Sequence, residues 1–208
     1  MLHLSGVQKK YSQRIILDIP DLKIDSGIHW LKGSNGSGKS TFLKMVSGII
    51  PFDGNIELEN TSLKKHGVEY RRLISYAEAE PLYPDFLTGE DLIRFYNSVR
   101  KSDPRDSNSS IEKFGIGGYY KNPIGTYSSG MVKKLSLVLA FIGKTKLILL
   151  DEPFVTLDVA TVQVLIENIK ELHQQGCDFI FTSHQSPEME ALPLSSEMIA
   201  KNNTVCFL

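Results

Sequence analysis

Hydrophobic positions recur along the chain with two different periods. Residues 2–24 alternate apolar and polar side chains in short runs, which predicts two or three strands with a turn near residues 9–12. A short apolar run at residues 27–31 predicts another strand. From Lys39 the apolar spacing becomes helical, and Gly48 is the expected end of that helix. The chain is therefore expected to open with strands and to enter a helix after a glycine-rich loop.

Strands and helices continue to alternate further along the chain. Thr88 followed by Asp91 predicts a capping box at the start of a helix. Ser128 or Ser129 is expected to cap an apolar helix that runs to residue 142. The other expected elements are strands at residues 52–58, 73–77, 147–150 and 178–182 and a helix at residues 161–173. This order predicts an α/β fold with a mainly parallel sheet, while the polar composition of residues 101–126 predicts a mobile segment.

Composition and charge narrow the class of protein. The chain has 208 residues, of which 41% are hydrophobic and 23% charged, and this is typical of one globular domain. Its 23 basic and 24 acidic side chains leave a formal net charge of -1. The surface as a whole therefore has no strong positive potential that would attract nucleic acid. The basic run at residues 63–72 is interpreted as a solvated turn or helix face, because interleaved aromatics do not stand out. We expect no nucleic-acid partner.

The cysteines and the hydropathy of the chain indicate the cellular compartment in which the protein works. Cys177 and Cys206 form neither a disulfide framework nor a zinc pattern, which fits a reducing cytosol. The N-terminal residues lack the apolar core of a secretory signal. No window reaches the roughly 18–20 apolar residues that a membrane-spanning helix needs. If the protein works at a membrane, we expect another chain to provide the spanning part.

Residues 33–40 carry a phosphate-binding motif. They read Gly33, Ser34, Asn35, Gly36, Ser37, Gly38, Lys39 and Ser40, which is G-x-x-x-x-G-K-[ST] between a predicted strand and a predicted helix. Glycines let successive backbone N–H groups point at phosphate oxygens, and the helix N-terminus adds partial positive charge. Lys39 can reach the β- and γ-phosphates, and the Ser40 hydroxyl can hold Mg²⁺. The motif predicts nucleotide binding.

Two acids end the apolar run at residues 147–150. The carboxyl ends of strands in open α/β sheets face the ligand crevice, and Asp151 and Glu152 follow this run directly. Asp151 can hold Mg²⁺ directly or through water, and Glu152 can polarise a water against the γ-phosphate. Acids that end a strand are often simple loop residues, but together with the phosphate loop they favour a functional pair.

Further motifs give the chain a family resemblance over nearly its whole length. Residues 127–131 read YSSGM where the family signature is usually LSGGQ, residues 151–153 read DEP, and residues 156–158 read TLD. With the phosphate loop, Tyr11 and His184, six motifs stand in the family's order. The chain resembles the ATP-binding subunit of an ABC transporter, and the YSSGM form and short length are similar to small exporter-type members.

The resemblance implies a fold. It is that of a P-loop NTPase with a mainly parallel core sheet, an N-terminal antiparallel β-subdomain and a short helical subdomain. Residues 1–208 would form a single ABC ATPase domain. In it, residues 1–79 and 127–208 would be the nucleotide-binding core, and residues 80–126 a reduced helical subdomain.

The resemblance also implies the roles of residues. ATP would be bound by Tyr11, Gly33, Ser34, Asn35, Gly36, Ser37, Gly38, Lys39, Ser40 and Thr41, with Mg²⁺ on Ser40 and Asp151 and the catalytic roles on Glu152 and His184. Ser128, Ser129 and Gly130 would face the ATP of a partner subunit, and Asp158 would form the D-loop. Alternatives stay open: Tyr11 as a surface aromatic, His184 as an ordinary loop histidine and Asp158 as a helix N-cap, which is compatible with the D-loop role.

Partners and location follow from the same resemblance. Two copies, or one copy and a similar ATPase, would close head to tail on ATP and drive a transmembrane permease. The chain would be cytoplasmic and peripheral on the inner face of the cell membrane. Its cofactors would be ATP and Mg²⁺.

The sequence departs from the family pattern at two positions. Ala79 stands where the family has a glutamine that contacts Mg²⁺ and water, and alanine offers no ligand oxygen. We hypothesise that Glu78 or Glu80 takes that role, and Glu80 is then a further candidate metal ligand. Ser129 replaces the first glycine of the signature pair.

Three other functions are compatible with a phosphate loop. Ala79 favours a regulatory module that dimerises on ATP and turns it over weakly, whereas Glu152 and His184 oppose it. A soluble mechanical ATPase acting on DNA or ribosomes usually carries coiled-coil insertions, zinc sites or two such domains, and none is seen here. A small-molecule kinase has no use for a second nucleotide-facing loop such as the signature.

Overall fold

The structure is a computed structural model that describes residues 1–183 and 191–208, apart from the side chains of residues 104 and 106. The strands are β1 (Leu2–Tyr11), β2 (Arg14–Ile24), β3 (Ile28–Lys32), β4 (Asp53–Leu58), β5 (Thr61–Ser62), β6 (Ile74–Ala77), β7 (Leu147–Asp151), β8 (Asp178–Thr182), β9 (Ser196–Lys201) and β10 (Thr204–Phe207). The helices are α1 (Lys39–Val46), α2 (Gly67–Leu73), α3 (Gly89–Arg100), α4 (Pro104–Lys113), α5 (Ser129–Ala140) and α6 (Val159–Gln174), with a short 3₁₀ helix at Ile124–Thr126.

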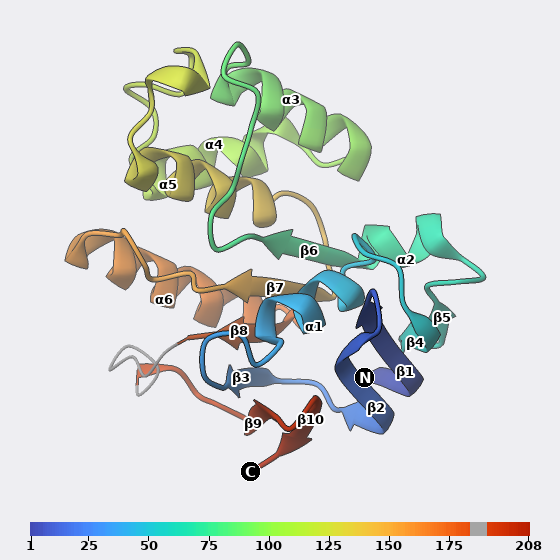
Figure 1. The fold of residues 1–208 in the computed structure, drawn as a ribbon. Helices are drawn as coiled ribbons and strands as arrows, with labels where there is room; N and C mark the ends of the chain where they lie inside the picture. The colour runs from blue at the N-terminus through green and yellow to red at the C-terminus, as the bar shows by residue number, and fades with distance from the viewer. Residues whose placement is uncertain (184–190) are drawn as a thin grey trace.

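These strands form two sheets. The larger has the order β10-β9-β3-β8-β7-β6, and its pairs β9–β3, β3–β8, β8–β7 and β7–β6 are parallel. The smaller has the order β2-β1-β4-β5 and is antiparallel throughout. Figure 1 shows the smaller sheet beside α1, and α3, α4 and α5 together beyond β6. The predicted α/β class with a mainly parallel sheet and an N-terminal antiparallel sheet is confirmed.

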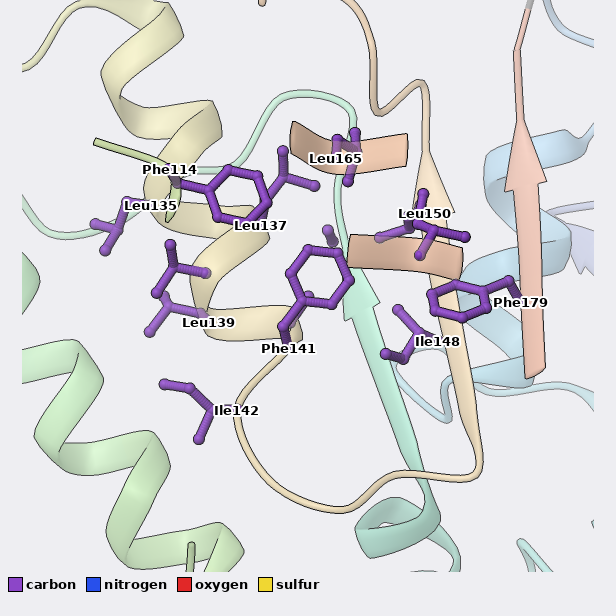
Figure 2. Packing of buried hydrophobic residues seen from close by; sticks show 14 of the residues in the cluster. Phe114, Leu135, Leu137, Leu139, Phe141, Ile142, Ile148, Leu150, Leu165 and Phe179 are labelled. Atoms are coloured by element: carbon purple, nitrogen blue, oxygen red, sulfur yellow. The ribbon is translucent and has the colours of Figure 1, made fainter. Parts of the chain in front are cut away.

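Two hydrophobic cores lie on opposite faces of the parallel sheet. Because side chains alternate along a strand, Leu147 and Leu149 of β7 join the core with α1 and the smaller sheet. Ile148 and Leu150 join the core with α5 and α6. Figure 2 shows these two β7 side chains facing Leu137 and Phe141, which come from α5 and its C-cap. Burial on both faces explains why residues 147–150 are apolar without alternation.

The chain between α3 and α5 differs from the expectation. Its polar composition predicted a mobile segment, whereas the structure places α4 there, with Asp103 as N-cap accepting a hydrogen bond from the Arg105 backbone N–H at 2.9 Å. Ile111, Phe114 and Ile116 are buried in the α5 core. One apolar residue of α4 and two just after it are buried, and composition alone did not indicate this helix.

The hairpin of β9 and β10 was not predicted. Its turn is formed by Asn202 and Asn203, both with positive φ angles (52° and 61°), and β9 pairs in parallel with β3. An Asn-Asn pair at positive φ is a signal for a two-residue hairpin turn. The hairpin completes the sheet edge next to the strand that leads into the phosphate loop.

Leu150 tests how much the α5 core contributes to stability. Its side chain is fully buried, so Leu150→Ala is expected to lower the free energy of unfolding by about 2–5 kcal/mol, through lost burial and the cavity left behind. Leu82 is 93% exposed, and Leu82→Ala is the matched control, expected to change it by less than about 0.5 kcal/mol. Urea unfolding of both variants measures the difference. Equal losses would contradict the assignment of Leu150 to the core.

Candidate functional site: a phosphate loop and the carboxyl edge of the sheet

The glycine-rich loop connects β3 to α1 and needs glycine at its ends. Gly33 and Gly38 have φ angles of 151° and 104°, in the range that favours glycine. A Cβ on Gly33 would lie 2.5 Å from Ser37 Oγ and 2.8 Å from the carbonyl oxygen of Ala200. A Cβ on Gly38 would lie 3.1 Å from Leu17 of β2. The loop is therefore enclosed by β2 and β9, which explains why only glycine fits at both positions.

Lys39 lies over this loop. Its side chain is buried, and its ammonium group donates hydrogen bonds to the carbonyl oxygens of Gly33 (2.8 Å) and Ser34 (3.3 Å). Helix α1 begins after Gly38 without a side-chain cap and has no acid in its first turn. Ser37 Oγ is buried and has no hydrogen-bond partner among the described residues. Free helix N–H groups, an ammonium and an unpartnered hydroxyl together form a site for an anion.

The carboxylate of Asp151 is held at the end of β7. The residue is 2% exposed, and its carboxylate accepts a hydrogen bond from the Tyr76 hydroxyl at 3.3 Å and another from the Thr182 hydroxyl. Burial, followed by the charge of Asp151, raises the pKa of Tyr76, so this phenol stays a donor. Sequence reasoning missed both partners.

Glu152 follows at a strained position of the backbone. Its φ angle is 45°, in the left-handed region, and its side chain is half-buried. Its backbone N–H donates to the hydroxyl (3.0 Å) and the carbonyl oxygen (3.2 Å) of Thr182. Thr182 therefore holds the Asp151 carboxylate and the backbone of Glu152, since its hydroxyl donates to Asp151 and accepts from the Glu152 backbone N–H.

The oxygens present fit Mg²⁺. The Asp151 carboxylate and the Ser40 hydroxyl are hard oxygen donors, which Mg²⁺ prefers. In residues 1–183 and 191–208, no group of three or more His, Cys, Asp or Glu side chains could hold a metal ion. Few protein ligands are typical of Mg²⁺ that is bound together with substrate phosphates and water. The donor set is therefore compatible with Mg²⁺ as a companion of a nucleotide.

The YSSGM segment forms the start of α5. Ser128 is the N-cap, and its hydroxyl accepts a hydrogen bond from the Met131 backbone N–H at 3.3 Å. Ser129 and Gly130 are the first residues of the helix. A Cβ on Gly130 would lie 3.1 Å from the carbonyl oxygen of Thr156, so glycine lets the two segments approach closely. The expectation that a serine caps this helix is confirmed for Ser128.

Asp158 links the start of α6 to α5. It caps α6 by accepting from the Thr161 backbone N–H and hydroxyl, both at 2.8 Å. It also accepts a hydrogen bond from the Lys134 ammonium at 2.8 Å. Lys134 is the largest cause of a lowered pKa for the Asp158 carboxyl. The N-cap interpretation of Asp158 is therefore confirmed, and a D-loop role stays a prediction.

The structure describes Tyr11, Glu78 and Glu80 but not His184. Tyr11 ends β1 with half of its surface exposed, and the Lys9 ammonium lies 4.7 Å from its ring centroid. Glu80 is exposed, whereas Glu78 Oε2 lies 3.2 Å from the ammonium of Lys44 on α1. The structure gives neither glutamate a contact with Asp151. His184, the candidate switch histidine, lies outside the described residues.

Lys133 is a buried cation that sequence reasoning missed. It is 1% exposed, and burial lowers its pKa to about 8. Its ammonium donates to three carbonyl oxygens, those of Glu78 (3.0 Å), Ala79 (3.1 Å) and Asp151 (3.1 Å). A lysine on a helix that is apolar nearly all round was the sequence feature that could have indicated a buried cation.

The loop and the carboxyl edge together define a class of protein. A glycine loop leads into an uncapped helix N-terminus, a buried lysine covers it, and an acid ends a neighbouring buried strand. This arrangement is that of a P-loop nucleotide-binding protein.

Comparisons with known proteins show the family. The ABC transporter family profile matches residues 17–155, more than half of the chain. The linearmycin resistance ATP-binding protein of Bacillus subtilis is 29% identical over 198 residues, which are 92% of this chain and 64% of that protein. The lantibiotic transport ATP-binding protein of Streptococcus pyogenes is 30% identical over 194 residues, which are 92% of this chain and 83% of that protein.

Solved structures agree on the fold. An ATP-binding subunit of an ABC transporter superposes with a TM-score of 0.90 at 24% identity, covering 100% of this chain and 90% of that one. A putative cobalt transport ATP-binding protein superposes with a TM-score of 0.82 at 22% identity, covering 99% and 78%. The chain belongs to the ABC transporter family and is one of its ATP-binding subunits, which hydrolyse ATP to drive transport.

Thr182 tests how the two acids are oriented. Thr182→Val removes the hydroxyl that serves Asp151 and Glu152, so it is expected to destabilise the fold by about 1–3 kcal/mol. Thr182→Ser keeps the hydroxyl, so its free energy of unfolding is expected to stay close to that of the parent. Urea unfolding distinguishes the two variants. If the valine and serine variants lose the same free energy of unfolding, the hydroxyl is not what stabilises this edge.

Proposed function

We propose that this chain binds Mg-ATP at residues 33–41 and hydrolyses it to energise a separate membrane permease. The single observation that carries the proposal is the buried Lys39 ammonium, which donates to two carbonyl oxygens of the loop. Triphosphate oxygens would take the place of these carbonyls as acceptors. The uncapped N-terminus of α1 and the unpartnered Ser37 hydroxyl supply further donors for phosphate. Exposed Tyr11 at the end of β1 is the proposed platform for adenine.

The chemistry of hydrolysis is assigned to the carboxyl edge. Glu152 is the proposed general base that takes a proton from the attacking water, and its hydrogen bonds to Thr182 fix the backbone from which the side chain starts. Ser40 and Asp151 would hold Mg²⁺, which neutralises charge on the phosphates when bound. Tyr76 and Thr182 keep the Asp151 carboxylate in place. His184 is proposed to stabilise the γ-phosphate and the water.

A second ATP-binding chain would complete each site. Ser128, Ser129 and Gly130 stand at the N-terminus of α5, where backbone N–H groups and the helix dipole favour the phosphates of a partner's ATP. Asp158 would contact the partner from the neighbouring D-loop. We propose a homodimer or a heterodimer with a similar ATPase that closes on ATP and opens after hydrolysis.

The permease would dock between α3 and the nucleotide-binding core. A hollow of about 300 Å³ lies there, with exposed Phe95 and Val99 of α3 and exposed Ile49 after α1 in its lining. We propose that residues 80–126 act as the reduced helical subdomain of a single 1–208 domain and that residues 1–79 and 127–208 form its core.

The chain would then work in the cytoplasm, peripheral on the inner face of the membrane. Within the described part of the chain, no helix is both long and apolar enough to span a bilayer. Two relatives are named for linearmycin resistance and lantibiotic transport, and we propose an exporter on that basis.

Glu152→Gln tests the proposed base and the dimer together. Glutamine keeps the shape of the side chain but cannot take a proton, so the variant is expected to stay as an ATP-bound dimer in saturating Mg-ATP. Light scattering measures its mass. The double variant Glu152→Gln with Lys39→Ala is the control and should remain monomeric because the ammonium over the loop is lost. A Glu152→Gln variant that stays monomeric would contradict the closure on ATP.

Glu78 and Glu80 test the hypothesis about the missing glutamine. If one of them replaces it, Glu78→Ala or Glu80→Ala should lower the ATPase rate by about tenfold or more. Phosphate release by each variant and by the parent measures the effect, and Glu59→Ala, a change in the exposed turn after β4, is the surface control. If both variants match the parent, neither glutamate has the role.

A further inference from the structure

Helix α5 carries one charge into the protein interior. Lys133 is 1% exposed, and residues 135–140 of the same helix are also buried. A buried ammonium costs much free energy unless every donor finds an acceptor. Lys133 meets this condition because it has three donors and three carbonyl acceptors, all within 3.1 Å.

The three acceptors lie on two neighbouring strand ends. Glu78 and Ala79 follow β6, and Asp151 ends β7. The parallel pairing of these strands ends at Ala77 and Leu150, so the carbonyl groups beyond that pair do not bond to each other in the ladder. Lys133 inserts at the point where the ladder stops and joins the two strand ends. Its bonds go to the backbone and not to a carboxylate, so it fixes chain positions instead of pairing with one movable side chain.

The same helix also carries the signature segment. Lys133 lies three residues after Gly130, and the next residue, Lys134, donates to Asp158. The first turns of α5 are therefore attached to the end of β7 and to the start of α6. A shift of α5 would move the carbonyl of Asp151, whose carboxylate is already held by Tyr76 and Thr182.

We propose that Lys133 is a positioning residue that sets Asp151 and Glu152 in register with the signature helix. It also anchors the backbone of Ala79, the position where a glutamine side chain would otherwise reach the site. Lys133 touches neither nucleotide nor water in this assignment. It acts through the strand ends, and the inference rests on the proposed function, in which Asp151 and Glu152 serve ATP hydrolysis.

Lys133→Met tests this assignment in the full chain. Methionine keeps much of the length but donates no hydrogen bond, so kcat for ATP is expected to fall by about tenfold or more, while KM and the affinity for a fluorescent ATP analogue stay within about twofold. KM and affinity are expected to change less than kcat because the phosphate loop with Lys39 is not altered. Lys133→Gln keeps two amide donors and should recover part of kcat. Thermal unfolding shows which variants are folded.

Lys113→Met is the matched control. Lys113 lies on α4 and pairs with Glu171 at 2.5 Å on the surface, so its loss should leave kcat and KM within about twofold of the parent. A Lys133→Met variant with the kcat of the parent would overturn the inference, as would equal losses of catalysis and ATP binding. If neither Lys133 variant folds, the residue is structural and the inference is wrong. A parent chain that binds ATP but releases no phosphate would instead refute the proposed hydrolysis.

Discussion

The parallel pairing of β3, β8, β7 and β6 is the constraint on which the site depends. Because all four strands run the same way, their carboxyl ends open at one edge of the sheet. The phosphate loop leaves β3 there, the two acids leave β7 there, and Thr182 ends β8 between them. Residues more than a hundred positions apart thus share one edge, and both faces of the sheet behind it are buried.

Buried polar groups hold this edge in one arrangement. Lys39, Asp151, Thr182 and Lys133 are each less than one-tenth exposed, and each makes hydrogen bonds within the protein. Polar groups removed from water are costly when left unpaired, so a displaced member would lose its partner and gain no water. The acceptors of Lys39 are carbonyls of the glycine-rich loop, and in the proposed function a bound phosphate would replace them. The proposed function therefore requires a network that is fixed around the acids and exchangeable at the loop.

The chain keeps the family architecture while changing two of its usual side chains. Ser129 occupies a signature position as the first residue of α5, and the close approach to Thr156 falls on Gly130, which remains glycine. Ala79 removes a side chain at the strand end of β6, yet its carbonyl oxygen accepts a hydrogen bond from Lys133. At both places the structure shows a contact made by the backbone and not by the changed side chain.

Local chemistry is what the sequence determined by itself. The glycines and Lys39 of the phosphate loop, the Ser128 cap and the acids after an apolar strand could all be predicted, because each depends on neighbours within a few residues. Tyr76, Thr182 and Lys133 could not, since they lie 75, 31 and 18 positions from Asp151 and only the sheet and α5 bring them together. For the same reason the sequence did not predict β9, which pairs with distant β3, or α4, which is held by packing in the core shared with α5. Hydrogen bonds and packing act across a few ångströms of space, and the tertiary structure alone decided which distant residues came within that reach.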